Sequence, residues 1–587
     1  MKRYIFSMLL IAVSMIAMAV PAKRGWQEIE QADGTTVELQ LVGDEFCHFW
    51  VNRDGQRVRE VNGMFEVAGE APTAEEFVAK RNAVQARRNM RKAQAAVGVT
   101  PNLAPRGVVI LANFDGTTMR AAHTQAVFDE LCNSDNCTVN SYGGVKYPSA
   151  AQYFADQSHG KYRPIFDVYG PVTLSHNYKH YGQNLWVYDE YMQEYGYYGD
   201  DSLATDAVVE ACLLANQQYN IDFTQYDSDN DGYIDFVYVI YAGKGEADGG
   251  SSNTIWPHNW EVSSAIYYKS CTYTRQQAKV DGKYIENYAM SSELSGSALS
   301  GIGTLVHEFG HVMGLPDFYD INYGTNYDQQ LTPNEWDVMD GGAYNGGGHC
   351  PPNYSPWEKY FFGWLTPENL GTNGQYIELT ANGLQGYKAY QFNASGAQKE
   401  ATDEGLSYYF ENRQKQGWDR DIPAEGLVIW KVDFNANAWM NNTPNGVANK
   451  PRYTLVCSEG KKVGASYGAK NVFPYGELDS CVVVADKPLR EITKDGQTVS
   501  LVYIQDAVEP TITWMANGEI VETQVYNSRD ALELPATLVE PCEDDAEIIG
   551  WTEEENWADP FVKPEDFFES ADGKKVTTNT TYHAVYK

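Results

Sequence analysis

Cysteine is scarce in this chain, with nine among 587 residues. That density excludes a small scaffold held by disulfides, and the absence of any C-x-x-C pair argues against a structural zinc site. Cys132 and Cys137 are close enough in sequence for a local disulfide, although spacing alone does not pair them. Beyond the N-terminus no stretch of about 18 apolar residues occurs, so we expect no later segment to span a bilayer.

Basic residues are scarce outside the N-terminal part. The net charge is −35, and residues 1–106 hold 14 Lys and Arg against 12 Asp and Glu, so the negative excess belongs to the rest of the chain. Such a surface repels phosphate backbones and excludes nucleic acid as an expected partner, whereas it suits calcium. With 43% apolar and 13% aromatic residues, the chain can build several folded cores.

The N-terminus has the pattern of an export signal, residues 1–19. Lys2 and Arg3 precede an apolar run that ends in the small residues Ala17-Met18-Ala19, which suit cleavage. A first transmembrane helix is the alternative, and the shortness of the run disfavours it. We therefore expect a soluble, secreted, extracellular protein, with association to the cell surface left open.

Composition divides the remainder into four parts of an α+β protein. The expected boundaries are 20–100 for a pro-segment, 101–370 for the main domain, 371–505 for a β-rich region and 506–587 for a small β module. The pro-segment combines a β-rich unit with a basic helix at 73–97, and we expect an exposed cleavage site within 80–106. The clearest apolar strand patterns are 107–114, 426–433, 480–484 and 511–514.

The main domain contains a zinc-binding pattern. His307 and His311 are four residues apart, so on a helix both rings project from one face and can hold one ion. Glu308 stands beside them, placed to take a proton from a zinc-bound water. Gly314 lets the chain leave the helix sharply and bring Asp317 round as third ligand, which leaves a fourth position for water. The alternative is an amphipathic helix that carries two ordinary histidines. Chance rarely produces such a helix together with a glycine and an acid at the remaining motif positions.

These residues resemble the extended zinc motif of the metzincin metalloproteases, and more closely the immune-inhibitor-A family of secreted bacterial metalloproteases. The likeness covers roughly residues 105–450 and includes 153–172, 242–246, 255–258, 355–364 and 411–419. It implies a zincin-like catalytic domain that hydrolyses peptide bonds of protein substrates, with Met339 in an apolar floor below the zinc. The chain departs from the family at Lys431, where histidine is common, and in its single short C-terminal module.

In the implied mechanism, zinc polarises the scissile carbonyl, and Glu308 takes a proton from the attacking water and passes it to the leaving amine. Tyr344 and His258 are candidates for a further donor to the oxyanion. Packing is the alternative role for both.

A calcium loop is expected ahead of a buried strand. Its ligands would be Asp227, Asp229, Asp231, the Tyr233 carbonyl and Asp235. Position 12 is Tyr238 instead of glutamate, and an apolar strand follows instead of a helix, so the pattern favours a structural calcium site over an EF-hand sensor. An acidic surface turn is the alternative.

The pro-segment suggests a latent enzyme. Cys47 could place a thiolate on the zinc and hold a proenzyme silent, although a buried core thiol is an alternative, and Asp44 or Glu45 could serve instead. The C-terminal module resembles the small β-grasp-like repeats of bacterial surface proteins, which would bind a surface or matrix ligand. Two rival functions remain: a non-enzymatic, calcium-stabilised adhesion protein on a degenerate protease fold, and an exported zinc hydrolase acting on non-peptide substrates.

Overall fold

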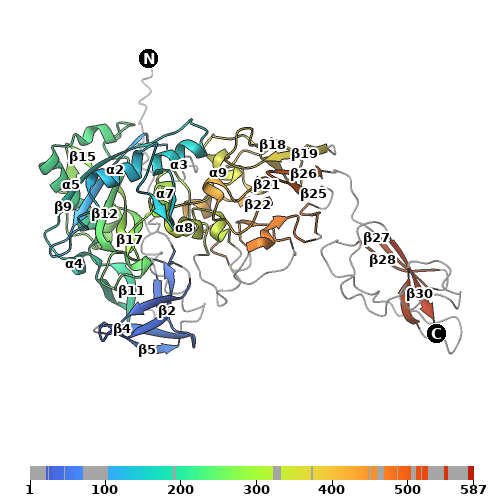
Figure 1. Cartoon of the computed structure of the whole chain (residues 1–587), viewed down its shortest axis with the longest axis horizontal. Coiled ribbons are helices and arrows are strands. Elements are labelled where there is room, and N and C mark those ends of the chain that lie inside the picture. Colours follow the sequence, from blue (N-terminus) through green and yellow to red (C-terminus); the bar gives the residue numbers. More distant parts are fainter. Residues whose placement is uncertain are drawn as a thin grey trace, which may run out of the picture.

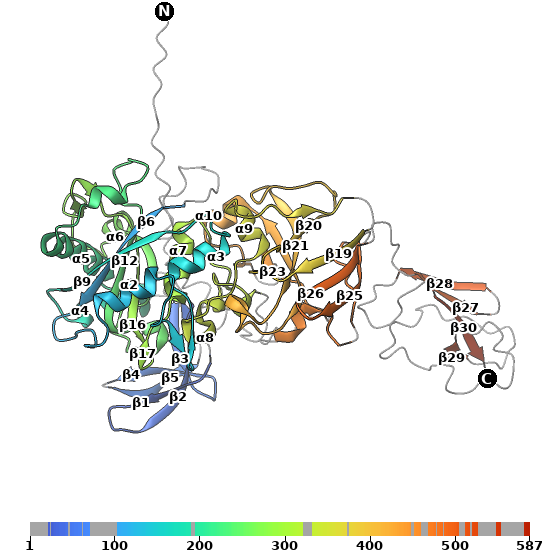
Figure 2. The same cartoon turned by 45° about the horizontal axis from the view of Figure 1, so that its top comes forward.

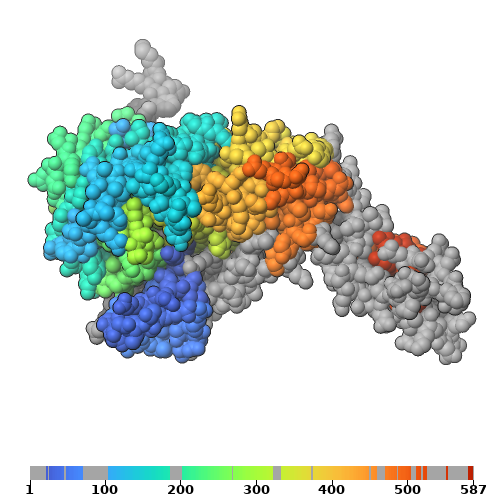
Figure 3. All heavy atoms as spheres, in the orientation of Figure 1, coloured from blue at the N-terminus to red at the C-terminus, as the bar shows by residue number. Residues whose placement is uncertain are grey.

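The computed structural model describes most of the chain from residue 21 onward. The described residues are 21–23, 25–44, 47–61, 63–70, 103–189, 194–320, 332–371, 375–447, 451–458, 468–476, 478–484, 487–503, 511–516, 519–525, 548–552 and 580–586. The expected export signal and the basic helix at 73–97 lie outside them. A blue N-terminal sheet packs below a central body, the downstream sheets lie beside that body, and the last described strands stand apart at the far end (Figures 1 and 2). In the space-filling view the blue and the orange segments both lie against the central body (Figure 3).

The N-terminal unit is a sheet of five antiparallel strands in chain order. They are β1 (Gln27–Glu30), β2 (Thr36–Asp44), β3 (Cys47–Val51), β4 (Gln56–Val61) and β5 (Met64–Glu70). In β2 the buried Leu39 and Leu41 alternate with more exposed residues, as the pattern predicts for a half-buried strand. Asn52 closes the tight turn into β4, because its carbonyl accepts from Gly55 N.

The central body is built on a mainly parallel sheet in the order β13-β16-β12-β6-β9. Its strands are β6 (Arg106–Asn113), β9 (Ile165–Thr173), β12 (Val237–Lys244), β13 (His258–Glu261) and β16 (Asn287–Ser295), with β17 (Ala298–Leu299) paired to β16. Only β13 and β17 run antiparallel to β16. Three further antiparallel pairs are β7 (Ser141–Tyr142) with β8 (Val145–Lys146), β10 (Asn184–Asp189) with β11 (Glu194–Asp201), and β14 (Lys279–Val280) with β15 (Lys283–Tyr284).

Helices cover both faces of this sheet: α2 (Gln125–Asn133) and α7 (Gly303–Val312) on one face and α5 (Ala204–Tyr219) on the other. The other helices of this part of the chain are α3 (Ala150–Gln157), α4 (Tyr178–Gly182), α6 (Val262–Tyr268), α8 (Asn345–Gly348) and α9 (Pro356–Phe361), of which α9 packs on the downstream region. The buried strand β6 divides its side chains between two hydrophobic cores: Val109 and Leu111 face the core shared with α7, while Val108 and Ile110 face the core shared with α5. This alternation with a period of two residues fixes which face carries α7.

The downstream region forms two further sheets. One has the order β18 (Glu368–Asn369), β20 (Tyr390–Phe392), β21 (Gly405–Arg413), β22 (Gly426–Phe434) and β23 (Tyr453–Leu455). The strand β24 (Val472–Phe473) also pairs with β22, and the helix α10 (Ala436–Met440) follows β22 in the chain. The other is β19 (Gln375–Thr380), β26 (Thr498–Tyr503) and β25 (Leu489–Asp495). The strand predicted at 426–433 is confirmed as β22.

The strand predicted at 480–484 is wrong. Cys481 is fully buried but makes only an isolated bridge to Leu489, and the chain then turns as Lys487 N donates to Val484 O. The apolar run reflects burial of one side chain and not a paired strand.

The last described strands form a separate sheet in the order β28 (Glu519–Val525), β27 (Thr511–Ala516), β30 (Thr580–Tyr586) and β29 (Ile548–Thr552). Trp514, Trp551 and Tyr582 pack together in it, with ring centroids 4.8 and 5.0 Å from Trp514.

Cys132 and Cys137, the pair considered for a local disulfide, are both free thiols. Among the described helices, none has the length and apolar character needed to cross a membrane.

Candidate metal centre

The predicted zinc-binding pattern forms α7 and the turn that follows it. His307 and His311 lie on this helix, and Asp317 is reached after Gly314, whose φ of +104° lets the chain reverse where other residues would be strained. The three side chains are buried, with exposed fractions of 0 to 1%. The structure thus brings together the three residues proposed as zinc ligands.

The three facing atoms form a nearly regular triangle. His311 Nε2 lies 3.1 Å from His307 Nε2, and Asp317 Oδ1 lies 3.2 and 3.3 Å from the two nitrogens. Zinc bonds of about 2.0–2.1 Å in a tetrahedron require ligand atoms about 3.3 Å apart. One carboxylate oxygen and two imidazole nitrogens at this spacing fit a zinc ion with an open fourth position.

Backbone carbonyls fix the orientation of both imidazoles. His307 Nδ1 donates to Val338 O at 2.7 Å, and His311 Nδ1 donates to Leu315 O at 2.9 Å. A carbonyl can only accept, so each Nδ1 carries the hydrogen and each Nε2 keeps its lone pair for a metal.

Charge around these atoms suits a cation. Burial lowers the pKa of His311, which keeps the ring in the neutral form that ligates metals. For Asp317 burial opposes ionisation, but the neighbouring imidazoles of His311 and His307 hold the pKa of the carboxyl below its usual range. The carboxylate is therefore ionised at neutral pH.

Glu308 lies on the same helix, fully buried, one residue after His307. The helix is held to the sheet by Phe309, whose ring lies 5.0 to 5.3 Å from those of Phe154, Phe166 and Phe236. Gly310 is required on its other side, because a Cβ there would lie 2.6 Å from Met339 Sδ. Met339 therefore packs directly under the motif, the position expected of an apolar floor.

The two candidate donors have different surroundings. Both ring nitrogens of His258 form hydrogen bonds within the fold, Nδ1 with Trp256 O at 2.6 Å and Nε2 with Tyr288 Oη at 3.1 Å. Tyr344 ends the short helix η6 (Gly341–Tyr344) beside α7. Burial, with the charges of Asp248 and Glu308, raises the pKa of its phenol, so the hydroxyl is a hydrogen-bond donor at neutral pH.

The N-terminal segment lies against this tyrosine. Tyr344 Oη donates to Pro21 O at 2.7 Å, and Lys23 N donates to Ala247 O at 3.2 Å. Lys23 Nζ also forms an ion pair with Asp248 at 2.8 Å. Residues 21–23 therefore contact a side chain predicted to act in catalysis.

A buried ion pair joins the N-terminal sheet to the central body. His48 Nε2 lies 2.9 Å from Glu246 Oε1, and the imidazole packs on Trp256 with ring centroids 4.3 Å apart. Its Nδ1 donates to Asp44 O. Glu246 lies in the segment 242–246, which resembles the family, but the sequence did not indicate that His48 would pair with it. Cys47 lies at the start of β3, and its side chain, like all of Glu45, lies outside the described residues, so a thiolate switch stays a prediction.

The acidic loop brings part of the expected calcium site together. Oxygens of Asp227, Asp229 and Asp231 lie within 4.8 Å of one another. Burial, with a smaller contribution from neighbouring carboxylates, raises the pKa values of Asp231 and Asp235, and a bound cation would lower both.

Two further features of this loop concern the expected calcium site: one was predicted from the sequence and the other was not. Tyr233 N donates to Asp231 at 2.8 Å, and the loop continues into β12 as a strand, as predicted. Lys283, which the sequence did not point to, places its ammonium on Asp227.

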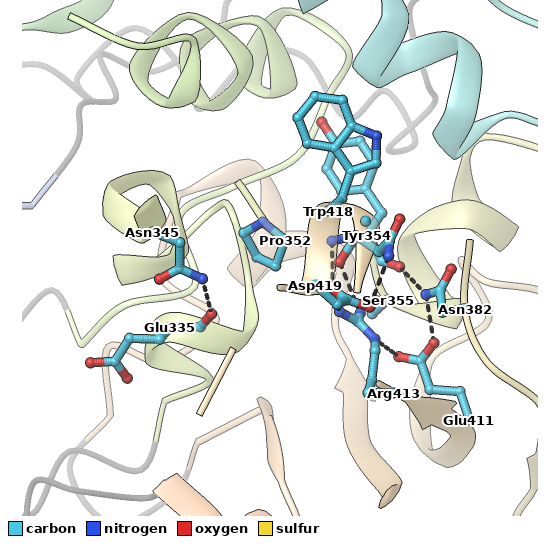
Figure 4. Close-up of polar contacts among 12 residues, drawn as sticks. Glu335, Asn345, Pro352, Tyr354, Ser355, Asn382, Glu411, Arg413, Trp418 and Asp419 are labelled. Atoms are coloured by element: carbon cyan, nitrogen blue, oxygen red, sulfur yellow. Dashed lines mark hydrogen bonds and ion pairs between the residues drawn. The ribbon is translucent and has the colours of Figure 1, made fainter. Parts of the chain in front are cut away.

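A buried charged network lies between the central body and the downstream sheet. Arg413, fully buried on β21, forms ion pairs with Glu411 at 2.7 Å and Asp419 at 2.8 Å, and Asn382 donates to Glu411 (Figure 4). Arg413 also donates to Asn353 O at 2.8 Å. These bonds join β21 to the segment that precedes α9.

Sequence reasoning also missed Asn442, in the turn after α10. It bonds to both the backbone and the side chain of Asp317. The only sequence signal is the asparagine-rich run 441–445, which has no metal-ligand spacing.

Comparison with known proteins matches residues 109–371 to the model of the immune inhibitor A peptidase M6 catalytic domain. Immune inhibitor A of Bacillus thuringiensis subsp. alesti is 30% identical over 234 residues, covering 37% of this chain and 32% of that protein. The pre-pro-metalloprotease PrtV of Vibrio cholerae serotype O1 is 25% identical over 293 residues, covering 44% and 30% respectively. The matches thus span about a third of the length of these curated relatives.

Proposed function

We propose, on the premise that residues 109–371 belong to the immune inhibitor A family of peptidases, that this chain is a secreted zinc-dependent endopeptidase that cleaves protein substrates. The observation that carries the proposal is the buried triangle of His307, His311 and Asp317, with Glu308 on the same helix. Zinc held there would polarise a carbonyl and lower the pKa of a water to about 7.

The chain's own groups then have defined tasks. Glu308 accepts the proton of the attacking water and delivers it to the leaving amine. Tyr344 donates its hydroxyl hydrogen to the oxygen on which negative charge develops, as it donates to the Pro21 carbonyl in this structure. Val338 and Leu315 keep the two imidazoles in the tautomer that ligates.

The protein is made as a proenzyme in this proposal. Support comes from the placement of residues 21–23, because Pro21 O uses the hydroxyl of Tyr344 that a substrate would need. The bonds of Lys23 to Ala247 and Asp248 and the pair of His48 with Glu246 hold the N-terminal unit in this place. Cleavage beyond residue 80 would release it.

Calcium in the loop Asp227–Asp235 serves stability and not catalysis. The proposal is supported by three clustered carboxylates and by the raised pKa values of Asp231 and Asp235. The C-terminal module, in the same proposal, binds a surface or matrix ligand and leaves catalysis to the central body.

Replacing Glu308 tests the mechanism. In activated protein, Glu308→Gln and Glu308→Ala should lower the hydrolysis rate of denatured casein by about 10²–10⁴-fold, because general acid–base transfer is lost. Zinc content, measured by mass spectrometry of the metal, should stay at one ion per chain because Glu308 is no ligand.

Zymography with and without o-phenanthroline separates the rival functions. Equal activity of parent and Glu308→Gln would refute the mechanism. An activated parent that holds zinc but cleaves no protein would favour the adhesion protein, or a hydrolase of non-peptide substrates.

A further inference from the structure

The carboxylate of Asp317 has two oxygens in different surroundings. Oδ1 faces His307 and His311, at 3.2 and 3.3 Å. Oδ2 accepts a hydrogen bond from Asn442 Nδ2 at 2.6 Å. The backbone N–H of Asp317 donates to Asn442 Oδ1, also at 2.6 Å. One amide therefore holds both the main chain and the side chain of the third ligand.

The orientation of this amide is determined by its partners. A backbone N–H can only donate, so the Asn442 oxygen faces Asp317 N and its NH₂ group faces Asp317 Oδ2. Turning the amide over would place NH₂ against N–H and oxygen against oxygen, so only one orientation satisfies both. Asp317 and Asn442 are both fully buried, and water does not compete for these bonds.

The backbone presents Asn442 in a conformation that few residues adopt. Its φ is +51°, in the left-handed region where asparagine and glycine are favoured. Asn442 N donates to Trp439 O, and Thr443 N donates to Ala438 O, so the turn continues directly from α10.

The turn is anchored against the segment that carries Asp317. The helices α10 and α9 lie close together (Figure 2). On α10, the ring of Trp439 lies 6.1 Å from Phe318 and 5.6 Å from Trp357 on α9. Asn445 Nδ2 donates to Phe318 O at 2.6 Å and to Tyr453 O at 2.7 Å. Neighbouring asparagines thus hold residues 317 and 318 from one side.

We infer that Asn442 is a positioning residue of the metal centre, which turns Asp317 so that Oδ1 points at the ion. This inference rests on the proposed function, since it assumes that Asp317 ligates zinc. Asn442 lies beyond the family match that ends at residue 371, so the downstream region completes the metal site from outside the matched catalytic domain. Removal of groups that orient metal ligands typically weakens metal binding 10–100-fold.

The experiment measures zinc affinity by competition with a chromophoric chelator, on the full chain. Asn442→Gly keeps the positive φ without strain and removes the amide, and it should bind zinc 10–100-fold more weakly. Asn442→Asp retains an acceptor for Asp317 N but sets a carboxylate against Oδ2, and it should weaken zinc binding at least as much. The visible absorption bands of the Co²⁺-loaded variants should shift, because the ligand geometry changes.

Two matched controls separate positioning from general structure. Asn437→Ala, on the exposed side of α10, should match the parent in both readouts. Asn445→Ala removes the hydrogen bond to Phe318 O without touching the Asp317 carboxylate. It should therefore lower the melting temperature but leave the zinc affinity close to that of the parent.

Each outcome decides one question. Parent-like affinity and Co²⁺ bands in Asn442→Gly or in Asn442→Asp would overturn the inference while leaving the proposed function intact. So would an equal loss of affinity in Asn445→Ala. Failure of the parent to bind one zinc per chain would instead overturn the proposed function. If Asn442→Gly does not fold, Asn442→Asp, which preserves size and backbone preference, decides the matter alone.

Discussion

Tyr344 makes a contact of the same kind as the one proposed for it with substrate. Its hydroxyl donates to a peptide carbonyl, that of Pro21, and its pKa is raised by burial and by the charges of Asp248 and Glu308. A neutral phenol at this place can stabilise a developing oxyanion without carrying a charge of its own.

Tyr344→Phe should therefore lower kcat of the activated enzyme by about 10²-fold, the effect of removing one oxyanion donor. KM and zinc content should change little, because the ring remains and no ligand is touched. Steady-state kinetics on a fluorogenic peptide measure this. The matched control is His258→Gln, which should leave kcat within a few-fold of the parent. A Tyr344→Phe enzyme with unchanged kcat would assign Tyr344 to packing.

At this scale the sequence predicts what is local. His307, Glu308, His311 and Asp317 lie within eleven residues, so the helix and the turn at Gly314 that follows it bring them together. Asn442 is 125 residues from Asp317, and His48 is 198 residues from Glu246. Such pairs depend on tertiary packing, which no local spacing encodes.

Among the elements, the acidic loop before β12 carries a prediction of its own. Chelating calcium with EGTA should lower the melting temperature, since a ligand at 100 times its Kd contributes about 2.7 kcal/mol. Thermal unfolding of the inactive Glu308→Gln protein, kept loaded with zinc, measures the shift without self-digestion.

Lys283 provides the matched variant. Its ammonium pairs with Asp227 and offsets part of the repulsion in the ion-free loop. Lys283→Met should therefore show a larger EGTA effect than the parent, because only calcium can then neutralise the loop. If the parent and Lys283→Met each had the same melting temperature with calcium as with EGTA, the proposed calcium site would be refuted.

The strands show where patterns succeed and fail. The runs at 107–114 and 426–433 are buried on both faces and paired on both edges, as β6 and β22. The run at 480–484 has one buried side chain, Cys481, and that residue alone pairs, through a single bridge to Leu489. Apolar residues predict burial, but a strand also needs a neighbour to complete its hydrogen bonds, and the neighbour is set by the whole fold.

Across the whole molecule, the N-terminal unit is attached through His48, a side chain whose charge depends on pH. Burial opposes protonation of His48, but the charge and hydrogen bond of Glu246 outweigh it and raise the pKa of the imidazole; Asp44 adds to this. A raised pKa in the docked state means that docking is strongest below the free histidine value of about 6.5, and that this contribution is lost as pH rises through the raised value.

The N-terminal unit should therefore dissociate more readily at alkaline pH. In protein nicked between residues 70 and 103, release of the unit on size exclusion, followed from pH 5 to 9, should increase with pH. His48→Gln keeps a side-chain donor but does not titrate, so its release should be nearly independent of pH. A His48→Gln protein with the same pH profile as the parent would show that another group controls docking.

The hydrophobic core around α7 has a practical meaning for protein production. Trp430, Val432 and Phe434 of β22 belong to the same continuous core as Phe309 and Met339. A recombinant fragment that stops where the family match stops, at residue 371, would leave that apolar surface facing solvent and lose Asn442. We therefore expect a soluble fragment to need β22 with both of its later partners, β23 and β24, so the folded unit is longer than the family match.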